Sequence, residues 1–253
     1  MPGISVVIIT LNEERNIGRC LDSVRDIADE VIVVDSFSTD RTEEICKQKG
    51  GRFVQHEFED YVKQHVFADS LATQDYILSL DADEALSEEL IYSIKEIKKD
   101  FKAEAYTMNR MTNYCGQWIK HCGWYPDKKL RLYHKDAGEW SGVKIHESFK
   151  LKEGISTMHL AGDILHYSFY TISEHIYQAN KFTDLTAQAA FEKGIRAGCI
   201  KIVFSPMAKF IRDYIFNLGF LDGYNGFLIC RISANATFLK YVKLKMLINQ
   251  NKL

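Results

Sequence analysis

Residues 76–83 read YILSLDAD, a short apolar run that ends in two carboxylates. A run of this length and composition predicts a strand that is covered on both faces. Asp81 and Asp83 then project to the same side, because side chains alternate with a period of two along extended chain. Ligands of open parallel sheets bind just beyond the carboxyl ends of the strands, and oxygen ligands there suit Mg²⁺ or Mn²⁺. The stretch therefore predicts a metal and nucleotide-diphosphate site, with a solvated Asp-x-Asp turn as the alternative.

The chain before this run alternates between strand-like and helix-like segments. Strands are predicted at 4–10, 31–34 and 52–56, the first of them buried. Acids open the helix after the first strand, and Ser, Thr and Asp side chains are available to cap the helix after the second. A βαβ series of this kind predicts right-handed connections and a largely parallel sheet. The polar loops at 10–16 and 35–42 then fall at the same edge of the sheet as Asp81 and Asp83.

Three segments together resemble family 2 glycosyltransferases of the GT-A fold: SVVIITLNEE at 5–14, VVDSFSTD at 33–40 and LDADE at 80–84. Within that family the chain is most similar to the lipopolysaccharide core β-1,4-glucosyltransferase-like branch. The motifs that carry this similarity are GWYP at 123–126, KLRLY at 129–133 and HE at 146–147. The resemblance covers residues 3–150 and continues more loosely beyond them. It implies an α/β, GT-A (Rossmann-like) fold with a mostly parallel sheet and helices on both faces.

The resemblance also implies a reaction. A sugar would pass from a nucleotide-diphospho sugar, with UDP favoured, to a hydroxyl of a cell-surface glycan or glycolipid acceptor such as lipopolysaccharide core. The family inverts the anomeric carbon in a single displacement. Mg²⁺ or Mn²⁺ would neutralise the leaving diphosphate as a Lewis acid, and a carboxylate would deprotonate the acceptor hydroxyl.

Most residues expected to hold the donor lie in loops after the strands or at the start of a helix. They are Thr10, Leu11, Asn12 and Glu13 beside the base and ribose, Asp35 as an acceptor for base or ribose, Lys63 and Gln64 beside the nucleotide, Asp81 at the ribose or a metal-bound water, Trp124 against a sugar ring, and Arg131. The alternative for Lys63 is a solvated helix start, and for Arg131 a pair with an acid. Many relatives carry Asp-Asp-Gly-Ser where this chain has Asp35, Ser36, Phe37 and Ser38. That departure leaves the identity of the base open.

The metal ligands and the catalytic base are expected among acids and histidines. Asp83 is the candidate for direct metal ligation, and His146 is a further metal ligand or a diphosphate contact. Glu147 is the candidate base, because the His-Glu pair matches the branch. The rivals for this role are Asp127, Asp136 and Glu139, and the alternative for the pair is a purely structural contact.

Two other classes of protein compete with this interpretation. A sugar nucleotidyltransferase would carry a Gly-rich phosphate loop after the first strand, where this chain has Leu11, Asn12, Glu13 and Glu14. A non-catalytic sugar-nucleotide-binding or membrane scaffold protein would not need the acids at 81, 83 and 147. The sequence therefore favours an enzyme.

The C-terminal part of the chain differs in composition from the rest. A boundary is expected near 165, between a catalytic domain at 1–165 and a helical region at 166–253, with helices near 173–193, 206–218 and 221–241. Residues 193–253 hold ten Lys and Arg against two Asp, so this stretch carries +8 and the rest of the chain −10. Basic, apolar helices suggest an anionic membrane surface. Helices that cover the sheet or form an oligomer contact are the alternative, and the oligomeric state is left open.

The motifs, the apolar runs and the cysteine spacing indicate which partners and compartments the sequence favours. No nucleic-acid reader motif accompanies the basic charge, and no apolar run approaches the ~20 residues of a membrane span. The six cysteines have no paired spacing, and Cys115, His121 and Cys122 lack a fourth zinc ligand. The N-terminal run lacks the basic preface of a secretory signal. We therefore expect a cytoplasmic protein, peripheral on the inner face of the cytoplasmic membrane if the helices bind lipid.

Overall fold

The computed structural model describes residues 2–142 and 148–250. The chain divides into two compact units. One contains Met1–Arg110 and Asp127–Tyr167, and the other contains Met111–Pro126 and Ser168–Leu253. The second unit thus takes residues 111–126 as well as the C-terminal helices, a division that a single boundary at 165 does not describe.

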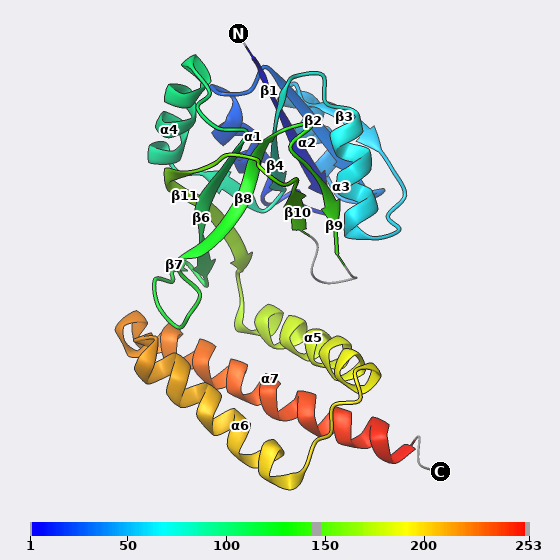
Figure 1. Ribbon diagram of the computed structural model, residues 1–253, viewed down its shortest axis with the longest axis vertical. Coiled ribbons are helices and arrows are strands. Elements are labelled where there is room, and N and C mark those ends of the chain that lie inside the picture. Colours follow the sequence, from blue (N-terminus) through cyan, green and yellow to red (C-terminus); the bar gives the residue numbers. More distant parts are fainter. Residues whose placement is uncertain (1, 143–147, 251–253) are drawn as a thin grey trace. The chain divides into compact units, whose positions relative to one another are not determined.

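The first unit is built on a sheet whose first half is parallel. Strands β1 (Ile4–Thr10), β2 (Glu30–Asp35), β3 (Arg52–Gln55) and β4 (Tyr76–Asp81) lie in the order β3-β2-β1-β4 (Figure 1). Their register sets Thr10 beside Asp35 and Ile9 beside Asp81. The carboxyl ends of β1, β2 and β4 therefore meet at one edge, as the sequence predicts.

The second half of the sheet contains antiparallel pairs. Beyond β4 the order continues β8 (Asp127–His134), β6 (Ala105–Tyr114), β11 (Thr157–Phe169) and β5 (Glu84–Leu86), and β7 (Gln117–Trp118) pairs with β6. Strands β9 (Gly138–Ser141) and β10 (Ser148–Leu151) form a separate antiparallel pair. The predicted α/β GT-A fold is confirmed, and the antiparallel strands extend its parallel part.

Helices cover both faces of the parallel strands, because β1 is apolar on both sides. Ile4, Val6 and Ile8 belong to a core formed with α1 (Ile17–Val24), α2 (Thr42–Gln48) and α4 (Glu88–Lys99). Val7 and Ile9 point the other way, into a core formed with α3 (Tyr61–Ser70). The alternation of side chains along one strand thus supplies two cores.

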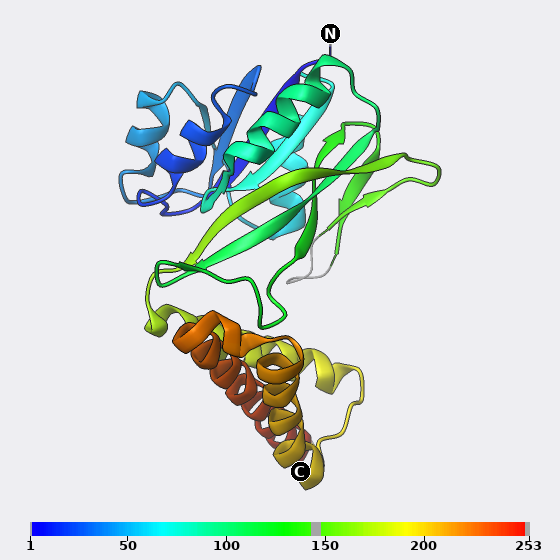
Figure 2. The ribbon, with the colours of Figure 1, turned by 90° about the vertical axis from the view of Figure 1, so that its left-hand side faces the viewer.

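The second unit is helical, as expected. It contains α5 (Ile172–Glu192), α6 (Cys199–Ile211) and α7 (Gly223–Gln250), with a π-helical turn at Arg212–Phe216 and a 3₁₀ turn at Gly219–Asp222. Helix α7 packs against both α5 and α6 (Figure 1, Figure 2). Helix α6 begins seven residues earlier than the predicted 206, and Pro206 lies inside it. In the described ranges no helix has both the length and the apolar character that a bilayer span needs.

Asp222 ties residues 111–126 to these helices. Its carboxylate accepts hydrogen bonds from the backbone N–H of His121 at 2.8 Å and lies 2.9 Å from the His121 Nδ1. Asp222 is buried, so these contacts give its charge the partners that a buried carboxylate needs. The segment that carries Cys122 and Trp124 is therefore part of the helical unit.

Candidate active site

The loops after β1 and β2 are joined by side-chain hydrogen bonds. The backbone N–H of Asn12 donates to Ser38 Oγ at 2.7 Å, and Asn12 Oδ1 accepts from the backbone N–H of Thr39 at 2.8 Å. Thr10 is buried, and its Oγ1 has no hydrogen-bond partner among the residues that the structure describes. A hydroxyl of this kind is available to a ligand at the strand end.

Phe37 takes the place of a glycine in the motif of relatives and keeps a glycine-like backbone. Its φ is +64°, in the left-handed region, which costs a side-chain-bearing residue of its bulk about 1–2 kcal/mol. Phe37 and Leu11 are both about half exposed, at 55% and 50%. The loop therefore holds a strained conformation that presents two apolar side chains at the edge where the donor is expected.

Asp35 and Gln64 are the buried polar groups of this edge. Asp35 Oδ2 accepts a hydrogen bond from the backbone N–H of Ser38 at 2.8 Å. Gln64 Nε2 donates to Ser36 Oγ at 3.1 Å, so the helix α3 is attached to the same loop. Lys63 lies elsewhere: its exposed ammonium pairs with Glu59.

Asp81 belongs to a network of two acids and two arginines behind the strand ends. Arg131 Nη2 lies 2.7 Å from Asp81 Oδ2 and 3.0 Å from Glu84 Oε1. Glu84 is fully buried, accepts from the backbone N–H of Asp81 at 3.0 Å and also pairs with Arg110 at 3.3 Å. Burial raises the pKa of the Asp81 carboxyl, but the Arg131 guanidinium outweighs burial and brings that pKa to about 2. Asp81 therefore stays ionised, and Arg131 pairs with acids.

Asp83 faces a histidine that sequence reasoning missed. Strand β11 pairs with β5 so that His166 lies opposite Glu84, and His166 Nε2 is 3.1 Å from Asp83 Oδ2. Burial lowers the pKa of His166, but the hydrogen bond to Asp83 and the charges of Asp83 and Glu84 outweigh burial and raise it. His166 Nδ1 is buried and has no partner within the described ranges. In sequence His166 is one polar residue in a strand-like stretch 83 residues from Asp83, so no local signal identifies it.

Glu13 lies in the electrostatic field of this pair. Burial raises the pKa of the Glu13 carboxyl, the hydrogen bond from Asn16 opposes that change, and the charge of Asp83 adds to it. Asn16 Nδ2 donates to Glu13 Oε2 at 2.7 Å. The Glu13 carboxylate is therefore oriented at the same edge of the sheet as Asp83.

Asp83 and His166 fit a divalent cation that is completed by a substrate. Mg²⁺ and Mn²⁺ prefer oxygen ligands and bind through one or two carboxylates plus phosphate oxygens. Imidazole nitrogen is the commonest metal ligand in proteins. No group of three or more His, Cys, Asp or Glu with metal-binding geometry occurs in the described part of the chain. An ion at Asp83 would therefore take its remaining ligands from a diphosphate and water.

Trp124 and a second tryptophan, Trp140, each contact other side chains of their own unit. Trp124 is in the second unit, with its ring centroid 6.0 Å from that of Tyr114. Trp140 stacks on His65 at 3.8 Å, and its Nε1 donates to Asp69 Oδ2 at 2.9 Å. Both rings thus serve packing within their own units.

The candidate bases are dispersed. Asp127 pairs with Arg110 at 2.9 Å, Asp136 lies in an exposed turn, and Glu139 points outward from β9. His146 and Glu147 lie outside the described residues. Among the acids that the structure does describe, none of these three joins Asp83.

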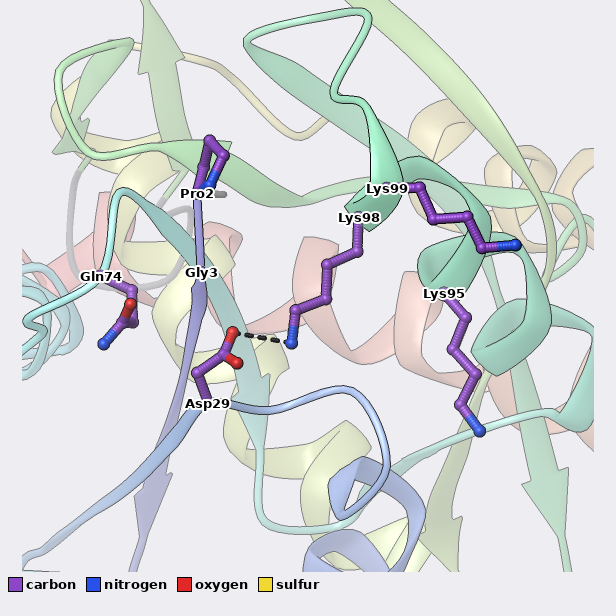
Figure 3. Close-up of a pocket in the computed structure, with 7 residues that line it drawn as sticks. All are labelled: Pro2, Gly3, Asp29, Gln74, Lys95, Lys98 and Lys99. Carbon is purple, nitrogen blue, oxygen red and sulfur yellow. Dashed lines mark ion pairs between the residues drawn. The ribbon is translucent and has the colours of Figure 1, made fainter.

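A pocket of about 360 Å³ lies at the opposite end of the parallel strands (Figure 3). It is lined by residues that include Pro2, Gly3, Asp29 and three lysines of α4. Lys98 Nζ pairs with Asp29 at 2.7 Å, and the other two lysines pair with Asp26 and Glu96. Their charges are therefore balanced by acids, and this pocket holds none of the residues discussed above.

A sheet whose parallel strands β2 and β4 end in Asp35 and Asp81 at one edge, with Asp83 just beyond, is the arrangement expected of a GT-A enzyme. This chain belongs to glycosyl transferase family 2, whose model matches residues 5–148. It is therefore a glycosyltransferase.

Curated relatives extend the similarity beyond the family model. The chain is 31% identical to an uncharacterized glycosyltransferase of Rickettsia typhi, over 98% of this chain and 88% of the relative. It is 29% identical to the lipopolysaccharide core biosynthesis glycosyltransferase LpsC of Rhizobium meliloti, over 95% of this chain and 91% of LpsC. Among solved structures, glucosyl-3-phosphoglycerate synthase from Mycobacterium tuberculosis matches with a TM-score of 0.49 and 16% identity, over 77% of this chain and 81% of that one.

Proposed function

We propose that this enzyme transfers a sugar, with inversion, from a UDP-sugar to a hydroxyl of a glycan or glycolipid acceptor of the lipopolysaccharide core. One observation carries the donor side of the proposal: Asp35 and Asp81 end the parallel strands β2 and β4 at one edge of the sheet, and Asp83, two residues beyond, contacts His166 of β11. The acceptor class rests on the similarity to LpsC, which covers 95% of this chain. Because nucleotide sugars are made inside the cell, we place the reaction on the cytoplasmic side.

The loops after β1 and β2 form the proposed nucleotide site. Thr10, Asn12 and Asp35 supply a hydroxyl, backbone groups and a carboxylate that can receive hydrogen bonds from the base and ribose. Leu11 and Phe37 supply exposed apolar surface for the base, and Phe37 stands where many relatives have the glycine of Asp-Asp-Gly-Ser. Gln64 holds the second loop in place through Ser36.

Asp83 and His166 are the proposed protein ligands of Mg²⁺ or Mn²⁺. The ion supplies charge neutralisation for the leaving diphosphate. Asp81 orients this end of β4 through its pair with Arg131, and its low pKa keeps a negative charge beside the site over the whole physiological pH range. His146 keeps its proposed role as a contact of the diphosphate or the metal, on sequence grounds.

Glu147 is the proposed general base, on the His-Glu motif of the branch. We expect Glu147→Gln to lower the transfer rate by about 10²–10⁴-fold, because the amide cannot accept the proton of the acceptor hydroxyl. The affinity for the donor nucleotide should stay within about twofold of the wild-type value. The measurement is steady-state kcat together with calorimetric nucleotide binding, and Glu153→Gln, at an exposed glutamate in the turn after β10, is the matched control. A collapse of nucleotide affinity would instead make Glu147 a binding residue.

The donor class is tested by calorimetric titration of UDP, GDP, CDP and ADP, with and without Mn²⁺. Of the four nucleotides we expect only UDP to bind well, and Mn²⁺ to strengthen its binding by about tenfold or more, because Asp83 would hold an ion whose charge offsets that of the diphosphate. Binding of a different nucleotide would reassign the base. Absence of binding by all four would contradict the proposed reaction and favour a scaffold protein.

A further inference from the structure

Helix α6 exposes an apolar face that the helical unit leaves uncovered. Its residues Ile200, Val203, Phe204, Met207 and Ile211, here called the outer face of α6, are each between 47% and 77% exposed. They recur at intervals of three and four residues, so they form one continuous stripe along the helix. Isolated exposed apolar residues are ordinary on a protein surface. A stripe of this length on one helix instead indicates a surface that a membrane or a protein partner covers.

The opposite side of α6 already has its partners. Ile202 packs against a cluster with Ala187, Ala190 and Leu244, and Phe210 packs against a cluster that includes Cys230. The helix therefore has an inner apolar side that builds the unit and a separate outer one. The side chains of the outer face of α6 therefore take no part in the apolar clusters that hold this unit together.

The apolar surface continues past the end of the helix. The next two turns expose further large side chains: Ile215, Phe216, Phe220 and Leu221. Phe216 is 75% exposed in the π-helical turn. Exposed apolar residues therefore occur along the chain from 200 to 221, in α6 and in the two short turns that follow it.

The charge around this surface is mainly positive, and the nearest exposed acid in sequence is Glu192 at the end of α5. In the described stretch 193–250 the only acids are Asp213 and Asp222, and both are buried. Asp213 pairs with Lys209 at 2.5 Å and with Arg212 at 3.1 Å, and Asp222 is held by His121. Three exposed cations precede or open α6: Lys193 caps the end of α5, Arg196 lies in the connecting loop, and Lys201 is in the first turn of α6. The surface of this stretch therefore presents positive charge that no exposed acid in it offsets.

We propose that the outer face of α6 docks on an anionic lipid bilayer. Apolar side chains on one helix face with cationic residues beside them are what an interfacial helix needs: the apolar groups reach the acyl boundary and the cations stay among lipid phosphates. A second copy of this chain fits the surface less well, because a symmetric contact through the same face would bring like charges together. This surface does not depend on the proposed reaction, because it is defined without any donor or acceptor residue.

The test is vesicle flotation of the full chain without donor or acceptor. One set of vesicles is pure phosphatidylcholine, and the other contains roughly 30 mol% phosphatidylglycerol. We expect binding to the anionic vesicles only, and weaker binding as salt is raised. Equal binding to both kinds of vesicle, or to neither, would overturn the proposal.

Variants separate the two parts of the surface. Phe204→Ser with Met207→Ser should weaken binding by about tenfold or more, because two apolar side chains no longer leave water. Arg196→Gln with Lys201→Gln should weaken it by about 30-fold, from about 1 kcal/mol for each cation at the bilayer surface. The matched controls are Val66→Ser with Tyr92→Ser and Lys128→Gln with Lys150→Gln, exposed residues of the first unit that should leave binding unchanged.

Two outcomes would assign the surface to something else. Full retention of vesicle binding by the Phe204 and Met207 variant would overturn the docking face. A lipid-free dimer that the same variant converts to monomer, seen by light scattering, would assign the outer face of α6 to a second copy. Each variant is also titrated with nucleotide. A variant that loses vesicle binding but still binds nucleotide has lost the membrane contact alone, so failure of the docking proposal can be distinguished from failure of the proposed reaction.

Discussion

Asp83→Ala should lower metal-dependent turnover by about 10³-fold while the protein stays folded. The expected loss corresponds to about 4 kcal/mol of transition-state stabilisation, the scale of charge neutralisation by a bound ion. The fold should survive, because Asp83 is partly exposed and its recorded side-chain partner is the ring of His166. Burial lowers the pKa of His166, and without Asp83 the main group that raises that pKa is gone, so the imidazole can become neutral instead of remaining a buried cation.

Mn²⁺ titrations of kcat give the decisive comparison. Asp83→Ala should lose both the rate and the response to Mn²⁺, and His166→Ala should keep part of the rate but need more Mn²⁺. Asp136→Ala, in an exposed turn, is the matched control and should behave as wild type. An Asp83→Ala enzyme with an unchanged rate in Mn²⁺ would remove Asp83 from the metal site.

Arg131→Met should destabilise the protein by about 3–5 kcal/mol, because it leaves the charges of two acids without their shared cation. Arg131 is buried, and the same Nη2 reaches Asp81 at 2.7 Å and the fully buried Glu84 at 3.0 Å. Met fills a similar volume, so the loss is one of charge and hydrogen bonding. Urea unfolding measures it as a change in the free energy of unfolding.

Two further variants show whether the loss of stability comes from the ion pairs of Arg131 with Asp81 and Glu84. Arg25→Met removes an arginine whose pair with Asp22 is exposed, and should cost less than about 1 kcal/mol. Glu84→Gln combined with Arg131→Met should cost less than the sum of the single changes, since the second change removes a charge that the first left unpaired. A loss of less than about 1 kcal/mol for Arg131→Met alone would contradict a buried ionic network.

The parallel half of the sheet and its polar edge could be predicted from the sequence. The strands 4–10, 31–34 and 76–81 are apolar, short and followed by polar loops, and the structure has strands at these places. Asp35 and Asp81 meet at one edge because consecutive parallel strands end on the same side. The local pattern of apolar and polar residues is sufficient to predict these strands, because each one is determined by its own residues.

The antiparallel half and the partners of the acids could not be predicted. Arg131 lies 50 residues from Asp81, and His166 lies 83 residues from Asp83. Neither separation leaves a periodic signal, because contact depends on how β8 and β11 enter the sheet. Trp140 shows the same difficulty: its ring is aromatic in sequence, but only the buried Asp69 and His65 show that it serves packing.

The pairing of β11 with β5 has a consequence for the order in which the site can form during synthesis. When the ribosome has completed β10 at Leu151, the growing chain already holds Asp35, Asp81 and Asp83, but not His166. Only after β11 has emerged and paired with β5 can the imidazole meet the carboxylate. A nascent chain therefore carries the acidic motifs well before the proposed ion site can be complete, because the contact between Asp83 and His166 waits for the last strand of the sheet to be made.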